Sequence, residues 1–121
     1  MLLEAARTEL AGGRYRAARA LAGRHAEQNP GDARPQLTLA EIDRREGDPA
    51  RQDEALAGYR RALALDPSAA EGWRGLGLVL KRRGDLPGAR DALARYLALA
   101  PQATDRAMIA AELRALSGGV P

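Results

Sequence analysis

Residues 70–101, AEGWRGLGLVLKRRGDLPGARDALARYLALAP, decide the fold that this sequence predicts. Apolar or small side chains recur there at the spacing of one helix face, which predicts an amphipathic helix over about residues 70–83. They are Trp73, Leu76, Gly77 and Leu80. Gly84 follows three cationic residues, an order typical of a helix C-terminus because glycine accepts the left-handed cap. The chain is therefore expected to turn at Gly84.

A second helix is expected directly after this turn. Pro87 suits the first turn of a helix, where its missing N–H costs nothing. The apolar face that follows, which ends before Pro101, consists of Ala89, Leu93, Tyr96 and Leu97. Two antiparallel helices joined by a short turn form one helical hairpin.

Two earlier stretches repeat these landmarks in weaker form. Helices are predicted over residues 2–10 and 15–28, followed by the turn cluster Asn29-Pro30-Gly31. The spacing from Pro30 to Gly47 equals that from Pro67 to Gly84, so a third helix aligns with residues 70–83 without gaps. Its partner helix resumes the register only after three extra residues, which we place in the turn GDPARQDE, residues 47–54.

The pattern changes once more after Pro101. Thr104 or Asp105 can start a last helix, which is predicted to run through Leu116 and to stop at Ser117-Gly118-Gly119. No partner helix follows. A single terminal helix is what a stacked array needs to cover its last apolar face.

Composition agrees with a helical domain built from small side chains. The 121 residues are 45% hydrophobic and 29% charged, which fits one soluble domain with a modest core. Only 3% are aromatic and none is Phe, so the core is expected to consist of Ala and Leu. There is no Cys and no apolar run of membrane-spanning length. A cytoplasmic location is expected if the chain is complete, and a periplasmic one if it belongs to an exported protein.

The helical hairpin, about 34 residues long, resembles the tetratricopeptide repeat. The residues that carry the resemblance are Trp73, Leu76, Gly77, Ala89, Leu93 and Pro101, with Tyr96 where a smaller residue is more usual. The resemblance implies an all-α fold, a right-handed superhelix of antiparallel helix pairs with about seven helices. We expect one domain over residues 1–121, with repeats at about 1–32, 33–69 and 70–103 and a capping helix at 104–117.

The resemblance also implies a function, since in this family the first helices of successive repeats line a groove that takes peptide or protein segments. Carried over by register, the groove positions are Leu3, Arg7, Leu10, Arg34, Leu37, Glu41, Arg44, Glu71, Arg74, Leu78 and Lys81. This set predicts a strip of leucines flanked by cations, which suits a segment with apolar anchors and some acidic groups. A non-catalytic bacterial adaptor or scaffold is the function expected.

One subclass of the family grips a C-terminal carboxylate with Lys and Asn. Leu3 and Arg7, or Leu37 and Glu41, occupy the positions where that pair is required. The sequence therefore does not support a carboxylate clamp.

Catalysis, metals and cofactors find no support in the residues. Ser68 and Ser117 have no histidine near them in sequence, so neither has the base that a nucleophile needs. His25 is the only histidine and lacks a second His or Cys ligand. Gly75 and Gly77 fall inside a predicted helix, where no phosphate loop forms. No enzyme activity, cofactor or small-molecule substrate is expected.

Two alternatives stay open. The net charge of +3 and the cationic ends at Arg44-Arg45 and Lys81-Arg82-Arg83 allow a nucleic-acid-binding edge, although such helix ends also have a structural reason in the helix dipole. The closing stretch RYLALAPQATDRAMIAAEL resembles the ends of tetratricopeptide modules in bacterial envelope proteins, including assembly factors and zinc metalloproteases. The chain has no HExxH motif, so it would be the non-catalytic part of such a protein. A monomer is expected.

Overall fold

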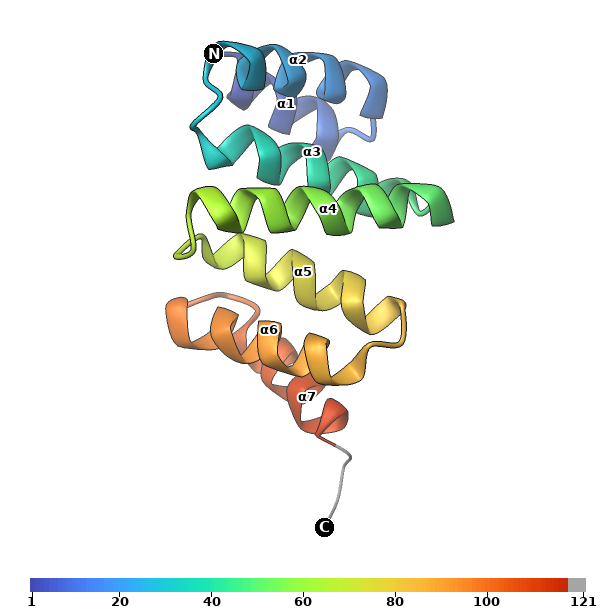
Figure 1. Cartoon of the computed structure of the whole chain (residues 1–121), viewed down its shortest axis with the longest axis vertical. Coiled ribbons are helices and arrows are strands. Elements are labelled where there is room, and N and C mark those ends of the chain that lie inside the picture. The colour runs from blue at the N-terminus through green and yellow to red at the C-terminus, as the bar shows by residue number, and fades with distance from the viewer. Residues whose placement is uncertain (118–121) are drawn as a thin grey trace. The chain divides into compact units, whose positions relative to one another are not determined.

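The computed structural model describes residues 1–117, and all of their regular structure is helical (Figure 1). The helices are α1 (Leu2–Ala11), α2 (Tyr15–Gln28), α3 (Ala33–Glu46), α4 (Pro49–Leu65), α5 (Ala70–Arg82), α6 (Leu86–Leu99) and α7 (Arg106–Leu116). The predicted all-α class and its seven helices are confirmed for these residues. The predicted stop of the last helix at Gly118-Gly119 lies outside them.

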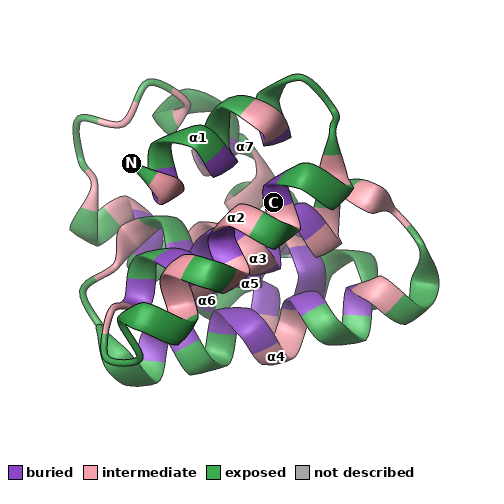
Figure 2. Cartoon of the chain, turned by 90° about the horizontal axis from the view of Figure 1, so that it is seen from above, coloured by how far each residue is buried: buried purple, intermediate pink, exposed green. Residues whose placement is uncertain are grey.

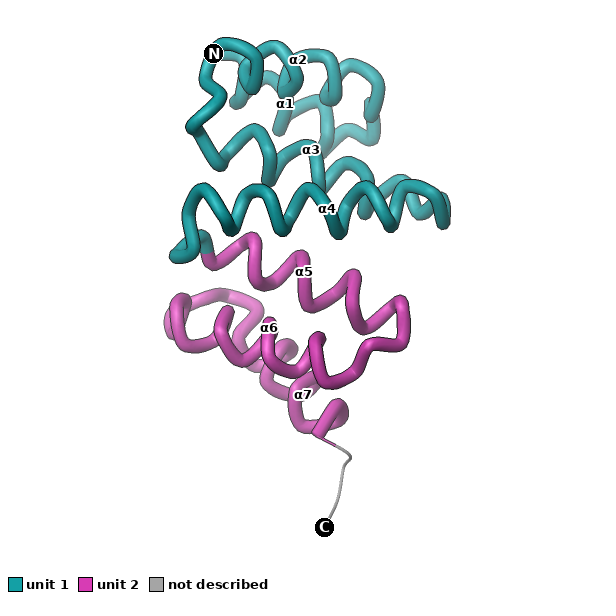
Figure 3. Tube along the Cα trace, in the orientation of Figure 1, with its two compact units in different colours: residues 1–69 teal, residues 70–121 magenta. Residues whose placement is uncertain are grey.

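The chain divides into two compact units, Met1–Ala69 and Ala70–Pro121, drawn in separate colours in Figure 3. In the first unit, α1 pairs with α2, α3 pairs with α4, and α2 packs against α3. In the second unit, α5 pairs with α6, and α7 packs against α6. The boundary between the units coincides with the predicted boundary between the second and third repeats. The assignment of residues 1–121 to a single domain stays a prediction.

The same turn closes each helical hairpin. Gly13, Gly47 and Gly84 have φ values of 76°, 77° and 86°, a left-handed conformation that other residues adopt only with strain. After α1 and α5 the chain makes the bond of a Schellman cap, from Arg14 N to Glu9 O and from Asp85 N to Leu80 O, both at 2.9 Å. Glycine is thus required where the sequence predicted the turns.

Aspartates begin three of the helices. Asp32, Asp48 and Asp85 each accept a hydrogen bond of 3.0 Å from a backbone N–H in the first turn of α3, α4 and α6. In α4 and α6, a proline within the first turn adds a favourable φ angle.

The three extra residues of the middle repeat lie in a helix, so their predicted place in a longer turn is wrong. The loop from α3 to α4 is only Gly47 and Asp48, and α4 has 17 residues where α2 and α6 have 14. The additional length is close to one helical turn, which leaves the rest of α4 in register with its partner. Asp48 and Pro49 start the helix early because they form a strong N-terminal signal.

Small residues allow the helices of each pair to approach closely. Ala6, Ala18, Ala40, Ala55 and Ala89 are at most 1% exposed, and Gly77 is buried. A Cβ on Gly77 would lie 2.7 Å from Leu93, and one on Gly58 would lie 3.0 Å from Ala40 Cβ. Larger side chains fill the remaining core, chiefly Ile42 and Tyr59 in the first unit and Leu93, Val79 and Ile109 in the second (Figure 2).

Candidate functional site

The residues predicted to form a partner-binding groove all lie on α1, α3 and α5, the first helix of each pair. Arg7, Arg34, Glu71 and Lys81 are exposed, whereas Glu41, Arg44, Arg74 and Leu78 are half-buried. Leu3, Leu10 and Leu37 are buried. Whether these residues contact a partner stays a prediction.

The strip of accessible leucines expected from the sequence is not formed in the first unit. Leu3 and Leu10 are each 7% exposed and Leu37 is 9% exposed. Leu10 belongs to a core cluster with Ala18 and Ile42. These side chains are turned toward the core because α1 and α3 have few other large apolar residues to bury. The accessible surface offered by the predicted positions of this unit is therefore mainly polar.

On α3, the predicted groove residues form a network with a tyrosine of the paired helix. Glu41 accepts hydrogen bonds from Arg44, from Arg45 at 3.0 Å and from the hydroxyl of Tyr59 at 2.7 Å. Arg44 Nε in turn donates to the Tyr59 oxygen at 3.3 Å. Tyr59 is 1% exposed and lies in the core. The hydroxyl group of its side chain lies at the polar face of α3 that holds Glu41 and Arg44.

These contacts change the proton affinities of the network. Burial alone would raise the pKa of Glu41, but the charge of Arg44 and the hydrogen bonds from Tyr59 and both arginines lower that pKa below its usual value. Burial and the neighbouring Glu41 carboxylate raise the pKa of Tyr59. At neutral pH the network therefore holds a carboxylate and a protonated phenol.

An equivalent arrangement ties α5 to the start of α7 in the second unit. Arg74 Nε donates to Asp105 at 2.6 Å, and the hydroxyl of Tyr96 donates to the same carboxylate at 2.5 Å. Two helical turns further along, Lys81 forms an ion pair with Glu112. Burial opposes ionisation of Asp105, yet the hydrogen bonds from Tyr96 and Arg74 lower its pKa. Burial and Asp105 raise the pKa of Tyr96. Two cations predicted for the groove are thus neutralised by acidic residues of the chain.

Arg34, at the start of α3, is held by the capping residue of the same helix. Its Nε and Nη2 donate to the two oxygens of Asp32 at 2.7 to 3.1 Å. Nε2 of His25, at the end of α2, lies 3.1 Å from Asp32 Oδ2. The hydrogen bonds from Arg34 lower the pKa of Asp32, although its partial burial opposes this. His25 therefore joins a carboxylate network, and it lies in no described group of three or more potential metal-binding side chains.

The acidic partners of these cations were missed in the sequence. Asp105 follows Arg74 by 31 residues, and Glu112 follows Lys81 by the same number. The two cations are therefore seven residues apart in the sequence, and so are the two acidic residues. This equal spacing was available as a signal, since a residue seven positions on lies on the same helix face. Asp32, the missed acidic partner of Arg34 at the start of α3, had no comparable pattern.

The charge pattern bears on the nucleic-acid alternative. Residues 1–69 carry equal numbers of acidic and basic side chains, so the net charge of +3 belongs to residues 70–121. Of the recurring cationic ends, Arg44, Arg45 and Lys81 each bond to a carboxylate of the chain. Paired cations offer fewer charges to phosphates. No observation favours this alternative.

Trp73, on the predicted apolar face of α5, is half-buried, and the guanidinium of Arg95 on α6 lies 4.7 Å from its ring centroid. This contact is a cation–π interaction, which leaves one ring face covered by a charged group rather than by apolar atoms.

Comparison with known proteins decides the family. A model of the tetratricopeptide repeat matches residues 48–114, more than half of the chain. The chain belongs to the tetratricopeptide repeat family. This repeat protein has the fold that the landmarks of residues 70–101 predicted. A search with its sequence against curated proteins finds no match.

Solved structures agree on the fold. The translocator chaperone SycD of Yersinia enterocolitica, in complex with a peptide of the translocator YopD, is 18% identical with a TM-score of 0.85, covering 98% of this chain and 91% of that one. The first tetratricopeptide domain of Spaghetti (RPAP3), bound to an HSP90 peptide, is 20% identical with a TM-score of 0.84. The match covers 98% of this chain and 89% of that one. Similarity at this level of identity extends to the fold alone.

A third similar structure carries the fold within an enzyme. The O-GlcNAc transferase of Thermobaculum terrenum is 24% identical with a TM-score of 0.81, and the match covers 95% of this chain but 21% of that one. The fold therefore occurs in non-catalytic domains and as a part of enzymes. Across the described part of this chain, no helix has the length and apolar character that crossing a lipid bilayer requires.

Proposed function

We propose that this tetratricopeptide protein is a non-catalytic interaction module, and that the first helices of its repeats contact a peptide or protein segment. The observation that carries the proposal is the pair of ordered polar networks at α3 and α5. Arg44 of α3 and Arg74 of α5 bond to the carboxylates of Glu41 and Asp105, and the hydroxyls of Tyr59 and Tyr96, on the second helices, bond to the same carboxylates. Ordered polar side chains on rigid helices give a partner fixed hydrogen-bonding groups.

The similar structures support this proposal. SycD binds a peptide of the translocator YopD in one of these structures, and the domain of Spaghetti (RPAP3) binds an HSP90 peptide in the other. In this chain the exposed cations at the predicted positions, Arg7, Arg34 and Lys81, are balanced in part by nearby acids. A partner segment with both acidic and polar residues fits this mixed surface better than a strongly acidic one.

The proposal is tested by affinity capture from the source organism with two charge-matched triple variants. One variant carries Arg7→Gln, Arg34→Gln and Lys81→Gln on first helices. The other carries Arg16→Gln, Arg60→Gln and Arg90→Gln, which are exposed positions on the second helices α2, α4 and α6. Both lose three positive charges, so non-specific electrostatic effects are equal.

The proposal predicts that a partner held by the parent is lost by the first variant and kept by the second. The reverse pattern would place binding on the second helices and contradict the proposal. Circular dichroism and thermal unfolding of all three proteins confirm that the helices are intact, as expected for exposed substitutions.

A further inference from the structure

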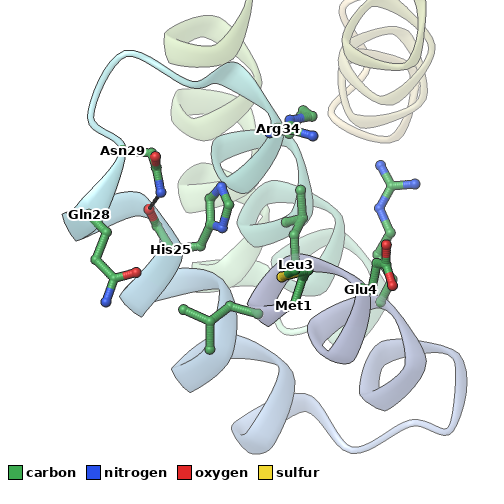
Figure 4. Close-up of a pocket in the computed structure, with 9 residues that line it drawn as sticks. Met1, Leu3, Glu4, His25, Gln28, Asn29 and Arg34 are labelled. Carbon is green, nitrogen blue, oxygen red and sulfur yellow. Dashed lines mark hydrogen bonds between the residues drawn. The ribbon is translucent and has the colours of Figure 1, made fainter.

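A pocket of about 490 Å³ opens in the first unit where the start of α1, the end of α2 and the start of α3 meet (Figure 4). Its lining residues are Met1, Leu2, Leu3, Glu4, Arg7, His25, Gln28, Asn29 and Arg34. Figure 4 shows side chains from all three helices around the opening, with His25, Gln28 and Asn29 on one side and Glu4 on the other. The pocket thus joins three predicted groove positions, Leu3, Arg7 and Arg34, to residues at the end of α2.

The lining combines an apolar part with a cationic one. Three consecutive apolar residues, Met1, Leu2 and Leu3, come from α1 and its cap. Met1 is 93% exposed, so an apolar group in the pocket would cover surface that is now in water. The volume is sufficient for a large side chain with its neighbouring backbone.

The charged lining residues are the cations Arg7 and Arg34 and the carboxylate of Glu4, and Arg34 is also paired with Asp32. The side chain of Arg34 is 64% exposed. Its hydrogen bonds to Asp32 use Nε and Nη2, and a guanidinium has five N–H donors in all. The Nη1 donors therefore remain for a second acceptor, and a hydrogen bond from a guanidinium to a carboxylate is stronger than one to a neutral group.

We propose that this pocket binds an internal peptide segment in which a bulky apolar residue adjoins an aspartate or glutamate. The apolar side chain contacts Met1, Leu2 and Leu3, and the acidic side chain binds Arg34. The proposal deepens the function proposed above and rests on it. It commits to a side-chain carboxylate, because the Lys and Asn that a C-terminal carboxylate requires are absent from the corresponding positions.

The test uses the full chain labelled with ¹⁵N and five synthetic hexapeptides. Four are acetylated and amidated, with two glycines on each side of Leu-Glu, Leu-Gln, Ala-Glu or Ala-Gln. The fifth is acetylated and ends in Leu-Glu with a free carboxylate. Titrations followed by NMR give the dissociation constant and identify the amides that shift.

We expect the capped Leu-Glu peptide to shift amides of residues 2–7, 25–29 and 34. Replacing its Leu by Ala is expected to weaken binding about tenfold, since most of the side chain is removed from apolar contact. Replacing Glu by Gln is expected to weaken binding about two- to fivefold and to remove most of its salt dependence. The free-carboxylate peptide is expected to bind no more tightly than the capped one.

Three substitutions in the protein test whether the carboxylate of the peptide binds at Arg34. Arg34→Gln is expected to weaken binding of the capped Leu-Glu peptide about two- to fivefold, and Glu4→Gln to strengthen it, because each changes one charge in the lining. Arg60→Gln, an exposed position on α4 outside the pocket, is expected to leave binding unchanged. Binding to the parent with the same affinity for Leu-Gln and Leu-Glu would overturn the acidic requirement.

Several results would overturn the pocket itself. These are no shifts with any peptide at millimolar concentration, or shifts confined to residues 70–117. Tighter binding of the free-carboxylate peptide would assign the site to chain ends instead. In each case partner capture with the matched triple variants still decides the interaction function, so the two failures are distinguishable.

Discussion

At the scale of single residues, Gly77 shows how closely two helices approach. An added Cβ would lie 2.7 Å from two atoms of Leu93, which is 0% exposed. Gly77→Ala is therefore expected to lower the free energy of unfolding by about 1–2 kcal/mol, because the overpacking outweighs the gain in helix propensity. Gly23 also lies inside a helix, but nothing lies within 4 Å of its would-be Cβ.

Gly23→Ala is thus a matched control with the opposite sign. It is expected to raise the free energy of unfolding by up to about 1 kcal/mol through helix propensity. Urea denaturation followed by circular dichroism measures both changes. Stabilisation by Gly77→Ala would mean that the approach of α5 and α6 is looser than the structure has it.

Tyr59 offers a second prediction at this scale. Its hydroxyl donates to the Glu41 carboxylate and accepts from Arg44 in a largely buried position. Tyr59→Phe is expected to cost about 1.5–3 kcal/mol of unfolding free energy, because a charged group loses its hydrogen-bond partner. Tyr15 is half-buried, and its hydroxyl makes no hydrogen bond within the described residues, so Tyr15→Phe is expected to change the free energy of unfolding by less than about 0.5 kcal/mol. Equal effects of the two substitutions would contradict the network.

At the scale of elements, α7 is an integral part of the second unit. Its Ile109 is 0% exposed, whereas the neighbouring Met108 is 54% exposed. Ile109→Ala is expected to lower the free energy of unfolding by about 2–4 kcal/mol, and Met108→Ala by less than about 0.5 kcal/mol. Chemical denaturation of the two variants checks this. Similar small effects would show that α7 does not cover the last repeat.

The bounds of the elements were largely predictable from the sequence. Glycines at the hairpin turns and prolines after alternate helices fix where helices end, and these are local effects. The three extra residues were misplaced because turns tolerate insertions, yet Asp48-Pro49 is a local start signal that favours an earlier helix. The polar networks were not predictable in the same way. Which acidic residue binds Arg74 or Lys81 depends on how close the helices lie to each other. Helix propensity carries no information about that distance.

At the scale of the whole molecule, the lowered carboxyl pKa values predict loss of stability in acid. The pKa values of Asp32, Glu41 and Asp105 are lower in the folded chain than their ordinary values. The stability they contribute is therefore complete above the ordinary carboxyl pKa near 4 and is lost as the pH falls through the folded-state values. The free energy of unfolding is expected to be level from about pH 7 to pH 5 and to fall below about pH 4.

Glu41→Gln separates one contribution from the rest. The variant is expected to be less stable than the parent at pH 7, and the difference is expected to shrink as the pH falls through the lowered pKa of Glu41, because the parent's carboxylate then becomes protonated. Urea denaturation at four pH values measures both curves. A difference that stays constant with pH would assign the effect to packing and not to charge.

The central claim is that partners bind through the first helices of the repeats. Hydrogen–deuterium exchange on the chain, alone and saturated with a captured partner or its binding segment, tests this claim most directly. Binding through the first helices would slow exchange in peptides covering α1, α3 and α5, with little change in those covering α2, α4 and α6. Protection confined to α2, α4 and α6 would contradict it.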